Sequence, residues 1–365
     1  MASLELMLEN RWFLPGETIR GTLDVRVDEQ LKHRGIFVEL LGVEETKIVR
    51  STGKSVITYR ESNIMARHLK VLCGEDVLVP PGEKFSFELR IPENALPTYS
   101  GSSAKVLWRV EAKVDVPLGL DLKAERMLFV GRVADERSLS PARIEFSEED
   151  VAGCLELPRR CISPGEDFEF NLRLDRVEKV RSVRLELWSY EVARARTLLG
   201  DVRDRSRTFQ ASWLLLKAHQ VGQGIRTFRV SVPRRVPLSY SGAWSSLTHE
   251  LKLVFDKPLS FDYVIRVPVE VAFVPRKRRA MARSAEEKWK AMEKEILVKK
   301  YIELILSDGK PRDVVDITLE LQMRYDLREE PSRVREICEE LVERGTLEKV
   351  EEGVLLAKYR IAKKA

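Results

Sequence analysis

The chain has 365 residues, of which 44% are hydrophobic and 33% are charged. This length predicts two or three domains, and the hydrophobic fraction excludes an intrinsically disordered chain. Its 63 basic residues are balanced by 58 acidic ones, and a net charge of +5 excludes the strongly basic surface typical of nucleic-acid-binding proteins. No apolar run is long enough to span a membrane and no signal peptide is visible, so we expect a cytoplasmic protein.

The polar residues and the cysteines indicate the source and the redox compartment. Only four asparagines and five glutamines accompany the many charged residues, a bias that favours a thermophilic prokaryote, with an ordinary charged surface as the alternative. We expect an archaeal source. Four scattered cysteines do not form a disulfide framework. The separation of Cys154 and Cys161 is too long for a zinc knuckle, so we expect two packed thiols in a strand pair, with a disulfide as the open alternative.

Strand patterns fill the first two-thirds of the chain. Apolar and polar residues alternate in Thr18–Val27 and again in Phe85–Ile91. A period of two indicates strands with one buried and one wet face. Turn dipeptides such as Pro15-Gly16 and Pro164-Gly165 separate these strands, a pattern typical of antiparallel sandwiches.

This region also repeats itself. The segment 14–25 recurs as 163–174, and 87–92 recurs as 228–233, displaced by 141 residues. The same displacement carries Ser100-Gly101 onto Ser241-Gly242, Asp115 onto Asp256 and Pro117 onto Pro258. We therefore predict two homologous β-sandwiches in tandem, covering residues 1–138 and 139–275.

The turn and core motifs of this region resemble those of the arrestin family, which includes arrestins, the arrestin-like subunit of retromer and bacterial sporulation-control proteins. They are Pro15–Glu17, Gly21, Gly42, Pro81–Pro92 and Pro97–Gly101. The resemblance covers about the first 275 residues and implies a two-lobed adaptor. Arrestins recognise phosphorylated receptors through a lysine pair in the first strand. Here the corresponding stretch, Leu4–Arg11, is acidic, so that role is not carried over.

The pattern changes after Pro275. Residues 276–294 read as a basic linker and the start of a charged helix, whose capping box begins at Ser284. Further helices are expected from about Arg312 to Arg324 and from Pro331 to Gly345, followed by a hairpin. Residues 295–365 thus resemble a winged helix-turn-helix domain. The predicted fold class is mainly β, with two tandem antiparallel arrestin-like β-sandwiches and a small α+β winged-helix domain.

No catalytic or metal-binding motif is recognisable. Gly53-Lys54-Ser55 lacks the earlier glycine of a phosphate-binding loop and is better explained by a hairpin turn. The histidines are scattered, and His249 is expected at a surface or rim position, whereas Trp108, Trp188 and Trp213 are expected in the core. We therefore expect no enzyme activity, no catalytic residue, no metal and no cofactor.

The candidate partner-binding residues lie in the last ninety residues. They are Arg276, Lys277, Arg278, Arg279, Arg283, Trp289, Arg333 and Arg335. The basic linker could also meet an anionic membrane surface. The third helix carries arginines at its start, where base contacts are usually made, but four glutamates follow, and residues 285–365 contain 17 basic and 19 acidic side chains.

Two functions remain open at this point. The first, which the acidic helix favours, is a cytoplasmic scaffold or adaptor that binds other proteins through the lobes and the winged helix. The alternative is a DNA-binding transcriptional regulator whose sandwiches sense or assemble. The sequence does not identify the partner, the pathway or the oligomeric state.

Limited trypsin digestion tests the linker prediction. The stretch 276–283 carries five positive charges and little apolar content, so like charges should keep it extended. Trypsin is expected to cut there first and to leave a stable fragment ending near Arg279. Cleavage elsewhere with resistance at this stretch would contradict the prediction.

Overall fold

The computed structural model describes residues 2–51, 55–75, 77–117, 119–197, 200–258, 261–274, 294–295, 298–325, 327–351 and 357–362. The chain divides into two compact units, Met1–Glu286 and Glu287–Ala365, and each is described by itself. None of the helices in the described ranges is long and apolar enough to cross a membrane. The Gly53-Lys54-Ser55 turn lies partly outside the described residues, although Ser51 and Val56 pair on either side of it.

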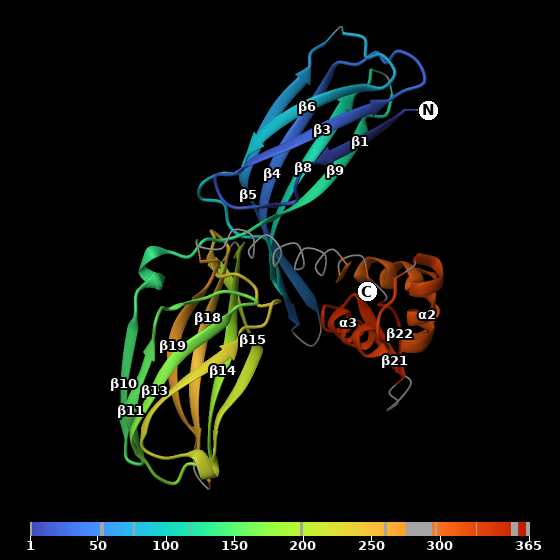
Figure 1. The fold of residues 1–365 in the computed structure, drawn as a ribbon. Helices are drawn as coiled ribbons and strands as arrows, with labels where there is room; N and C mark the ends of the chain where they lie inside the picture. Colours follow the sequence, from blue (N-terminus) through green and yellow to red (C-terminus); the bar gives the residue numbers. More distant parts are fainter. Residues whose placement is uncertain are drawn as a thin grey trace. The chain divides into compact units, whose positions relative to one another are not determined.

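The first lobe contains two sheets (Figure 1). One has the order β1 (Ser3–Leu8), β3 (Thr18–Arg26), β6 (Glu83–Arg90). The other has the order β2 (Trp12–Phe13), β9 (Leu122–Val130), β8 (Ala104–Asp115), β4 (Gly35–Ser51), β5 (Val56–Cys73), with β7 (Tyr99–Ser100) beside β8. The pairs are antiparallel except for β2 with β9. Apolar residues from both sheets, such as Ile19 and Ile36, form one core, so the lobe is a sandwich.

The second lobe has the same plan. Its first sheet runs β10 (Ala142–Glu148), β11 (Val151–Leu157), β13 (Asp167–Val177), β16 (Gly224–Ser231). Its second runs β12 (Cys161–Ile162), β19 (Tyr263–Val271), β18 (Ser245–Asp256), β14 (Ser182–Thr197), β15 (Gly200–Lys217), with β17 (Tyr240–Ser241) beside β18. Short 3-10 turns occur at Glu136–Leu139 and Ala218–Gln220. Phe146 and Phe255, one from each sheet, have ring centroids 5.6 Å apart in the core.

Equivalent strands confirm the internal repeat. The bounds of β16, β17, β18 and β19 each lie 141 residues after those of β6, β7, β8 and β9. Asp115 ends β8 and pairs with Arg34 at 2.6 Å, while Asp256 ends β18 and pairs with Arg181 at 2.8 Å. A duplicated ion pair at the same strand end follows from one sandwich plan used twice.

Tryptophan burial separates the core from the outer faces. Trp108 is fully buried and donates its indole N–H to the Leu96 carbonyl at 2.9 Å. Gly42 packs against this ring, since a Cβ at that position would lie 2.5 Å from it. Trp188 and Trp213, in contrast, are only half-buried. Trp188 lies on the outer face of β14, so the expectation that it belongs to the core is wrong. Trp213 lies opposite the buried Leu185, but on the last strand of the sheet, where the core is partly open.

Two further expectations are corrected. His249 is buried rather than at the rim, because it lies on the inner face of the central strand β18, where its Nδ1 is 2.9 Å from the Ser239 hydroxyl. Cys154 and Cys161 are both free and buried, but they do not share a strand pair. Cys154 lies on β11 and Cys161 on β12, in different sheets. Burial raises the pKa of the Cys161 thiol to about 12.

The second unit combines helices with a small sheet. Residues 298–305 are helical and lead into a 3-10 turn, Leu306–Asp308. The other elements are β20 (Arg312–Asp313), α2 (Val314–Tyr325), α3 (Pro331–Glu343), β21 (Leu347–Glu351) and β22 (Lys358–Ile361), with the sheet order β20-β22-β21. Arg312 pairs with Tyr359 in that sheet, so α2 begins two residues later than predicted. The predicted fold class, mainly β with a small α+β part, is confirmed.

Substitution of Trp108 tests which tryptophan supports the core. Trp108→Ala should lower the free energy of unfolding by about 3–5 kcal/mol, because it removes a fully buried indole and leaves a cavity. Trp213→Ala should cost clearly less, since that ring is half-exposed. Urea unfolding of the two variants measures the difference, and an equal or larger loss for Trp213→Ala would contradict this assignment of the core.

Candidate functional site

A buried carboxylate from the first lobe binds a turn of the second. Glu44, on β4, is fully buried. Its oxygens accept backbone N–H groups of Ala243 at 3.0 Å, Trp244 at 3.0 Å and Ser245 at 2.7 Å, and also the Ser245 hydroxyl at 2.8 Å. These donors replace the water that the charged group loses on burial.

A carboxylate of the second lobe binds the equivalent turn of the first lobe. Glu191, on β14, accepts the Tyr99 hydroxyl at 2.6 Å, the Ser102 hydroxyl at 2.6 Å and the backbone N–H of Ser103 at 2.8 Å. Glu44 and Glu191 lie on the equivalent strands β4 and β14, and each binds the turn that precedes an equivalent strand, β18 or β8. We call this reciprocal pair of carboxylates, with the two turns, the lobe joint.

Glycine is required in both turns of the lobe joint. A Cβ at Gly101 would lie 1.7 Å from Glu191 Oε2, and a Cβ at Gly242 would lie 2.2 Å from Glu44 Oε1. The repeated Ser-Gly dipeptides of the sequence are therefore explained by the close approach of a carboxylate from the opposite lobe. Sequence reasoning noted the glycines as a repeat but missed the glutamates, which also occupy equivalent strands.

Aromatic and charged side chains extend the lobe joint. The rings of Tyr99 and Tyr240 are 5.2 Å apart. Burial, and then the nearby Glu191 charge, raise the pKa of Tyr99 well above its usual range, so its hydroxyl remains a donor. At the margin, Arg50 pairs with Asp204 at 2.9 Å, and Arg132 pairs with Glu270 at 2.6 Å. Every one of these polar groups is held by fixed partners, an arrangement suited to positioning two lobes.

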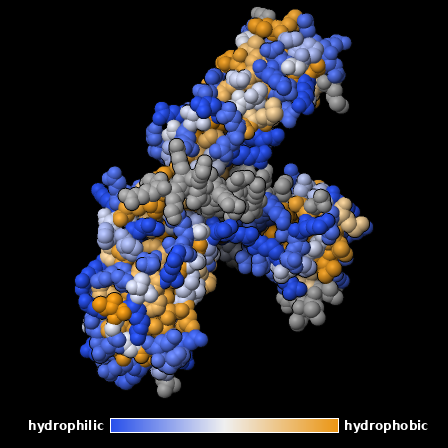
Figure 2. Space-filling model, viewed as in Figure 1, coloured by the Kyte–Doolittle hydropathy of each residue, from blue (hydrophilic) through white to orange (hydrophobic). Residues whose placement is uncertain are grey.

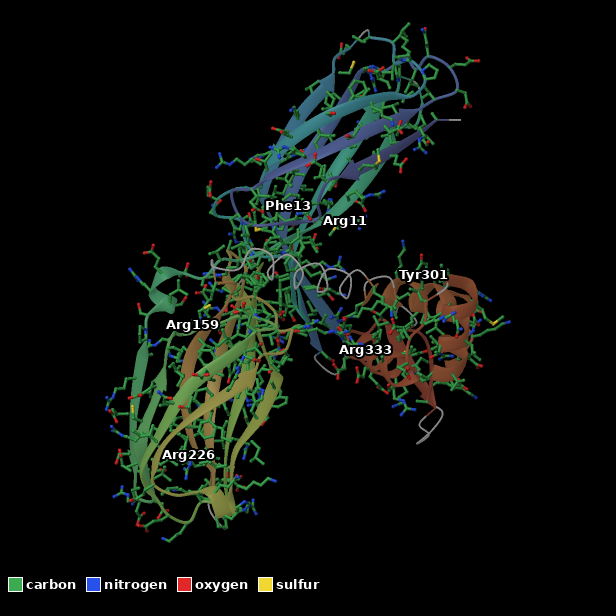
Figure 3. The ribbon with its side chains drawn as sticks, viewed as in Figure 1. Arg11, Phe13, Arg159, Arg226, Tyr301 and Arg333 are labelled. Atoms are coloured by element: carbon green, nitrogen blue, oxygen red, sulfur yellow. The ribbon has the colours of Figure 1, made fainter. Side chains whose placement is uncertain are left out.

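The predicted partner-binding residues divide into two groups. Arg276, Lys277, Arg278, Arg279, Arg283 and Trp289 lie outside the described residues. Arg333 and Arg335 are the third and fifth residues of α3, and Figure 3 labels Arg333 on this helix. Arg335 is exposed, whereas Arg333 is half-buried.

Arg333 is committed to contacts within its own unit. Its guanidinium pairs with Glu336 at 2.7 Å and with Glu295 at 2.9 Å. The hydrogen bond to Glu336 raises the pKa of Arg333. The pKa of Glu295 is lowered, because its ion pairs with Lys299 and Arg333 outweigh the effect of burial. Contact with a DNA base would require Arg333 to give up two carboxylates.

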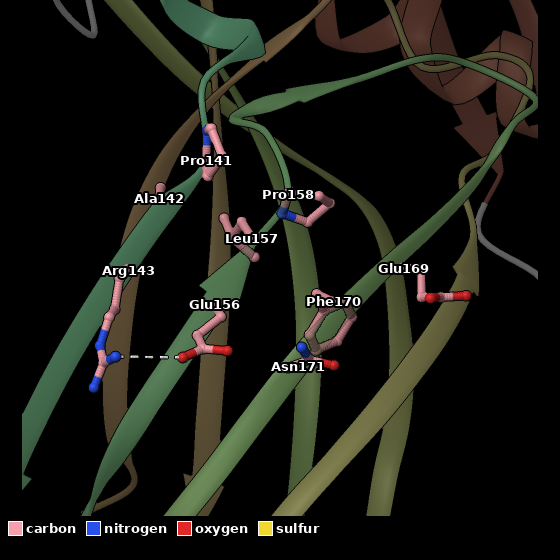
Figure 4. Close-up of a pocket in the computed structure, with 9 residues that line it drawn as sticks. All are labelled: Pro141, Ala142, Arg143, Glu156, Leu157, Pro158, Glu169, Phe170 and Asn171. Atoms are coloured by element: carbon pink, nitrogen blue, oxygen red, sulfur yellow. Dashed lines mark ion pairs between the residues drawn. The ribbon is translucent and has the colours of Figure 1, made fainter.

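One hollow lies on the first sheet of the second lobe (Figure 4). It has a volume of about 680 Å³ and lies between β10, β11 and β13. Its charged lining includes Arg143 and Glu156, whose side chains pair at 3.6 Å. Within the part of the chain that the structure describes, no three His, Cys, Asp or Glu side chains group closely enough to hold a metal ion.

Comparison with known proteins bears on the first lobe. Residues 3–137 match the family described as arrestin (or S-antigen), N-terminal domain. A search of curated proteins gave no match. Together with the mainly-β architecture, the family match supports an arrestin-like fold.

Neutral replacement of Glu44 tests the lobe joint. The Glu44 carboxylate accepts four hydrogen bonds from the turn of the second lobe. Glu44→Gln removes the negative charge and places an amide N–H₂ group, itself a donor, against some of these donors. Since bonds to charged groups contribute about 1.5–3 kcal/mol each, we expect a loss of about 3 kcal/mol or more in the free energy of unfolding. Glu191→Gln should behave alike.

The matched control is Glu88→Gln, which removes an exposed carboxylate paired with Arg20 on the first sheet. Its loss in the free energy of unfolding should be much smaller than that of Glu44→Gln, as is usual for exposed ion pairs. Chemical denaturation of the three variants provides the comparison. Equal stability of Glu44→Gln and wild type would show that the lobe joint contributes nothing to the folded state.

Proposed function

We propose that the protein is a non-enzymatic adaptor that binds other proteins through its two arrestin-like lobes and its C-terminal unit. The observation that carries this proposal is the lobe joint, in which the buried Glu44 and Glu191 hold two sandwiches together by reciprocal bonds. The carboxylates of the lobe joint are occupied by structural partners from the opposite lobe. What remains for other molecules is the surface of the sheets, their edges and the C-terminal unit. We place this activity in the cytoplasm.

The C-terminal unit fits the adaptor role better than DNA recognition. We infer a winged helix from the order of its helices and strands, with α3 as the counterpart of the recognition helix. Arg333 is ion-paired, and Glu336, Glu340 and Glu343 repel phosphates. Our proposal is that this winged helix binds protein, with the basic linker and Trp289 as further contacts. The linker could also meet anionic lipids.

Binding of duplex DNA by the full-length chain tests this proposal against a transcriptional regulator. We expect weak binding that depends steeply on salt and not on base sequence, because the linker attracts any polyanion. Selection from a random duplex library, followed by fluorescence anisotropy, measures the preference. A sequence bound about a thousandfold more tightly than random duplex would overturn the adaptor proposal.

Two variants serve as controls for that measurement. Replacing the five basic residues of 276–283 by glutamine should abolish the salt-sensitive binding. Arg333→Ala with Arg335→Ala should leave it unchanged, because α3 makes no base contacts in this proposal. Capture of partner proteins from the native host, identified by mass spectrometry, should succeed with wild type.

A further inference from the structure

Five arginines gather on one face of the second lobe, along the strands β14 and β15. Arg203, Arg205 and Arg207 alternate along β15, and Arg194 and Arg196 lie on β14. Arg194 is paired directly with Arg203 across the two strands, while Val192 faces Arg205 and Tyr190 faces Arg207. We call these five side chains the arginine face.

The arginine face points away from the lobe joint. Between its members on β15 lie Val202 and Asp204, which project to the other side of the strand. Val202 packs against the hydrophobic core of the first lobe, and Asp204 pairs with Arg50 at 2.9 Å. The side chains of Arg203, Arg205 and Arg207 are consequently exposed.

In the described part of the chain, these arginines are grouped on one sheet face without an ion pair, whereas many surface arginines of this protein are paired with a carboxylate. Arg20, Arg143 and Arg229 each pair with an acidic side chain at 2.7 or 2.8 Å. Within the described ranges, by contrast, no guanidinium of the arginine face takes part in an ion pair. Arg207 lies 5.6 Å from the ring centroid of Trp188, and Arg196 lies 5.1 Å from that of Trp244.

Asp201 lies opposite Arg196 on this face, but in the described register of β14 and β15 the other four arginines have no acidic residue directly opposite them. Like charges directly opposite each other in a sheet repel, as Arg194 and Arg203 do here. Arginine is also the side chain best suited to bidentate contacts with carboxylates. The repulsion between neighbouring arginines in the unbound protein and the use of arginine at these positions both indicate that an anionic ligand binds this face.

The spacing and the strand order favour an extended peptide as that ligand. Alternate residues of a strand are about 6.7 Å apart, so three arginines along β15 match acidic side chains at alternate positions of a second strand. β15 is the last strand of its sheet. The Arg203 carbonyl at this edge accepts the Arg50 guanidinium at 2.5 Å, so the edge is open from Arg205 onwards. A strand added there would lie about 4.8 Å away, with its side chains beside the arginines.

A single-stranded nucleic acid fits less well. Its binding sites combine cationic side chains with open aromatic rings on which bases stack. Here the Trp188 ring already holds two cations, with the Lys252 ammonium 4.4 Å from its centroid and Arg207 nearby. Phe209, half-exposed, packs edge-on against the same ring.

We propose that the arginine face is a docking site for an extended acidic segment of a partner protein, which pairs along β15 with carboxylates at alternate positions. The inference deepens the proposed adaptor function, on which the choice of a protein partner rests. Figure 2 shows that hydrophilic residues cover much of the visible surface, with hydrophobic residues among them.

Peptide binding to the full-length chain tests the proposal. The probe is a fluorescein-labelled peptide, Thr-Glu-Val-Glu-Val-Glu-Thr, and its partner probe is Glu-Glu-Glu-Thr-Val-Val-Thr, which has the same composition without alternation. We expect the alternating peptide to bind at least tenfold more tightly. The variant Arg203→Gln/Arg205→Gln/Arg207→Gln should weaken that binding at least tenfold while retaining the thermal stability of wild type, because it relieves repulsion.

The matched control removes the same charge elsewhere. Arg20→Gln/Arg143→Gln/Arg229→Gln also loses three positive charges, but from arginines that are ion-paired, and it should bind the alternating peptide as wild type does. Equal weakening in both triple variants would overturn the proposal in favour of general electrostatic attraction. Tighter binding of an oligothymidylate than of the peptide would overturn it in favour of nucleic acid.

A third contrary outcome concerns the edge itself. Charged side chains on an edge strand can serve only to prevent aggregation. Self-association of the Arg203, Arg205 and Arg207 variant without loss of peptide binding would establish that role and reject the docking site. If the alternating peptide does not bind but the protein still captures partner proteins from its host, the docking site is rejected and the adaptor function is retained.

Discussion

The burial of two carboxylates between the lobes is the constraint on which the first unit depends. A buried charge is tolerated only when several donors surround it. Glu44 and Glu191 each meet this requirement with a turn of the opposite lobe, and the requirement extends to Gly101 and Gly242, where a side chain would collide with the carboxylate. One duplicated interaction thus couples the two sandwiches and specifies residues in both.

The lobe joint also determines which surfaces are left for partners. The inner side of β15 is occupied, because Val202 and Asp204 face the first lobe. Since side chains alternate along a strand, the arginines between them must project outwards. The same strand therefore joins the lobes with one face and presents exposed arginines with the other. In the second unit, the acidic side chains of α3 hold Arg333, so charge there is largely satisfied internally.

Much of the fold could be predicted because it rests on local patterns. Alternation of apolar and polar residues located strands such as β3 and β6, and the 141-residue repeat located their equivalents. The incorrect predictions of burial concern residues whose exposure depends on the order of the strands in the sheet. His249 is buried because β18 lies inside its sheet, and Trp188 is half-exposed because it lies on an outer face. Neither position can be read from neighbours in the sequence.

The sequence by itself determined the class of the fold, the duplication and the turn positions, because period, proline and glycine act over a few residues. Only the tertiary structure decided what the charged residues do. The backbone nitrogen of Ser245 lies 2.7 Å from Glu44 Oε1, although the two residues belong to different lobes. Arg194 lies opposite Arg203 only because β14 pairs with β15 in that register. Coulomb and hydrogen-bond energies depend on distance in space, and folding brings distant positions of the chain together.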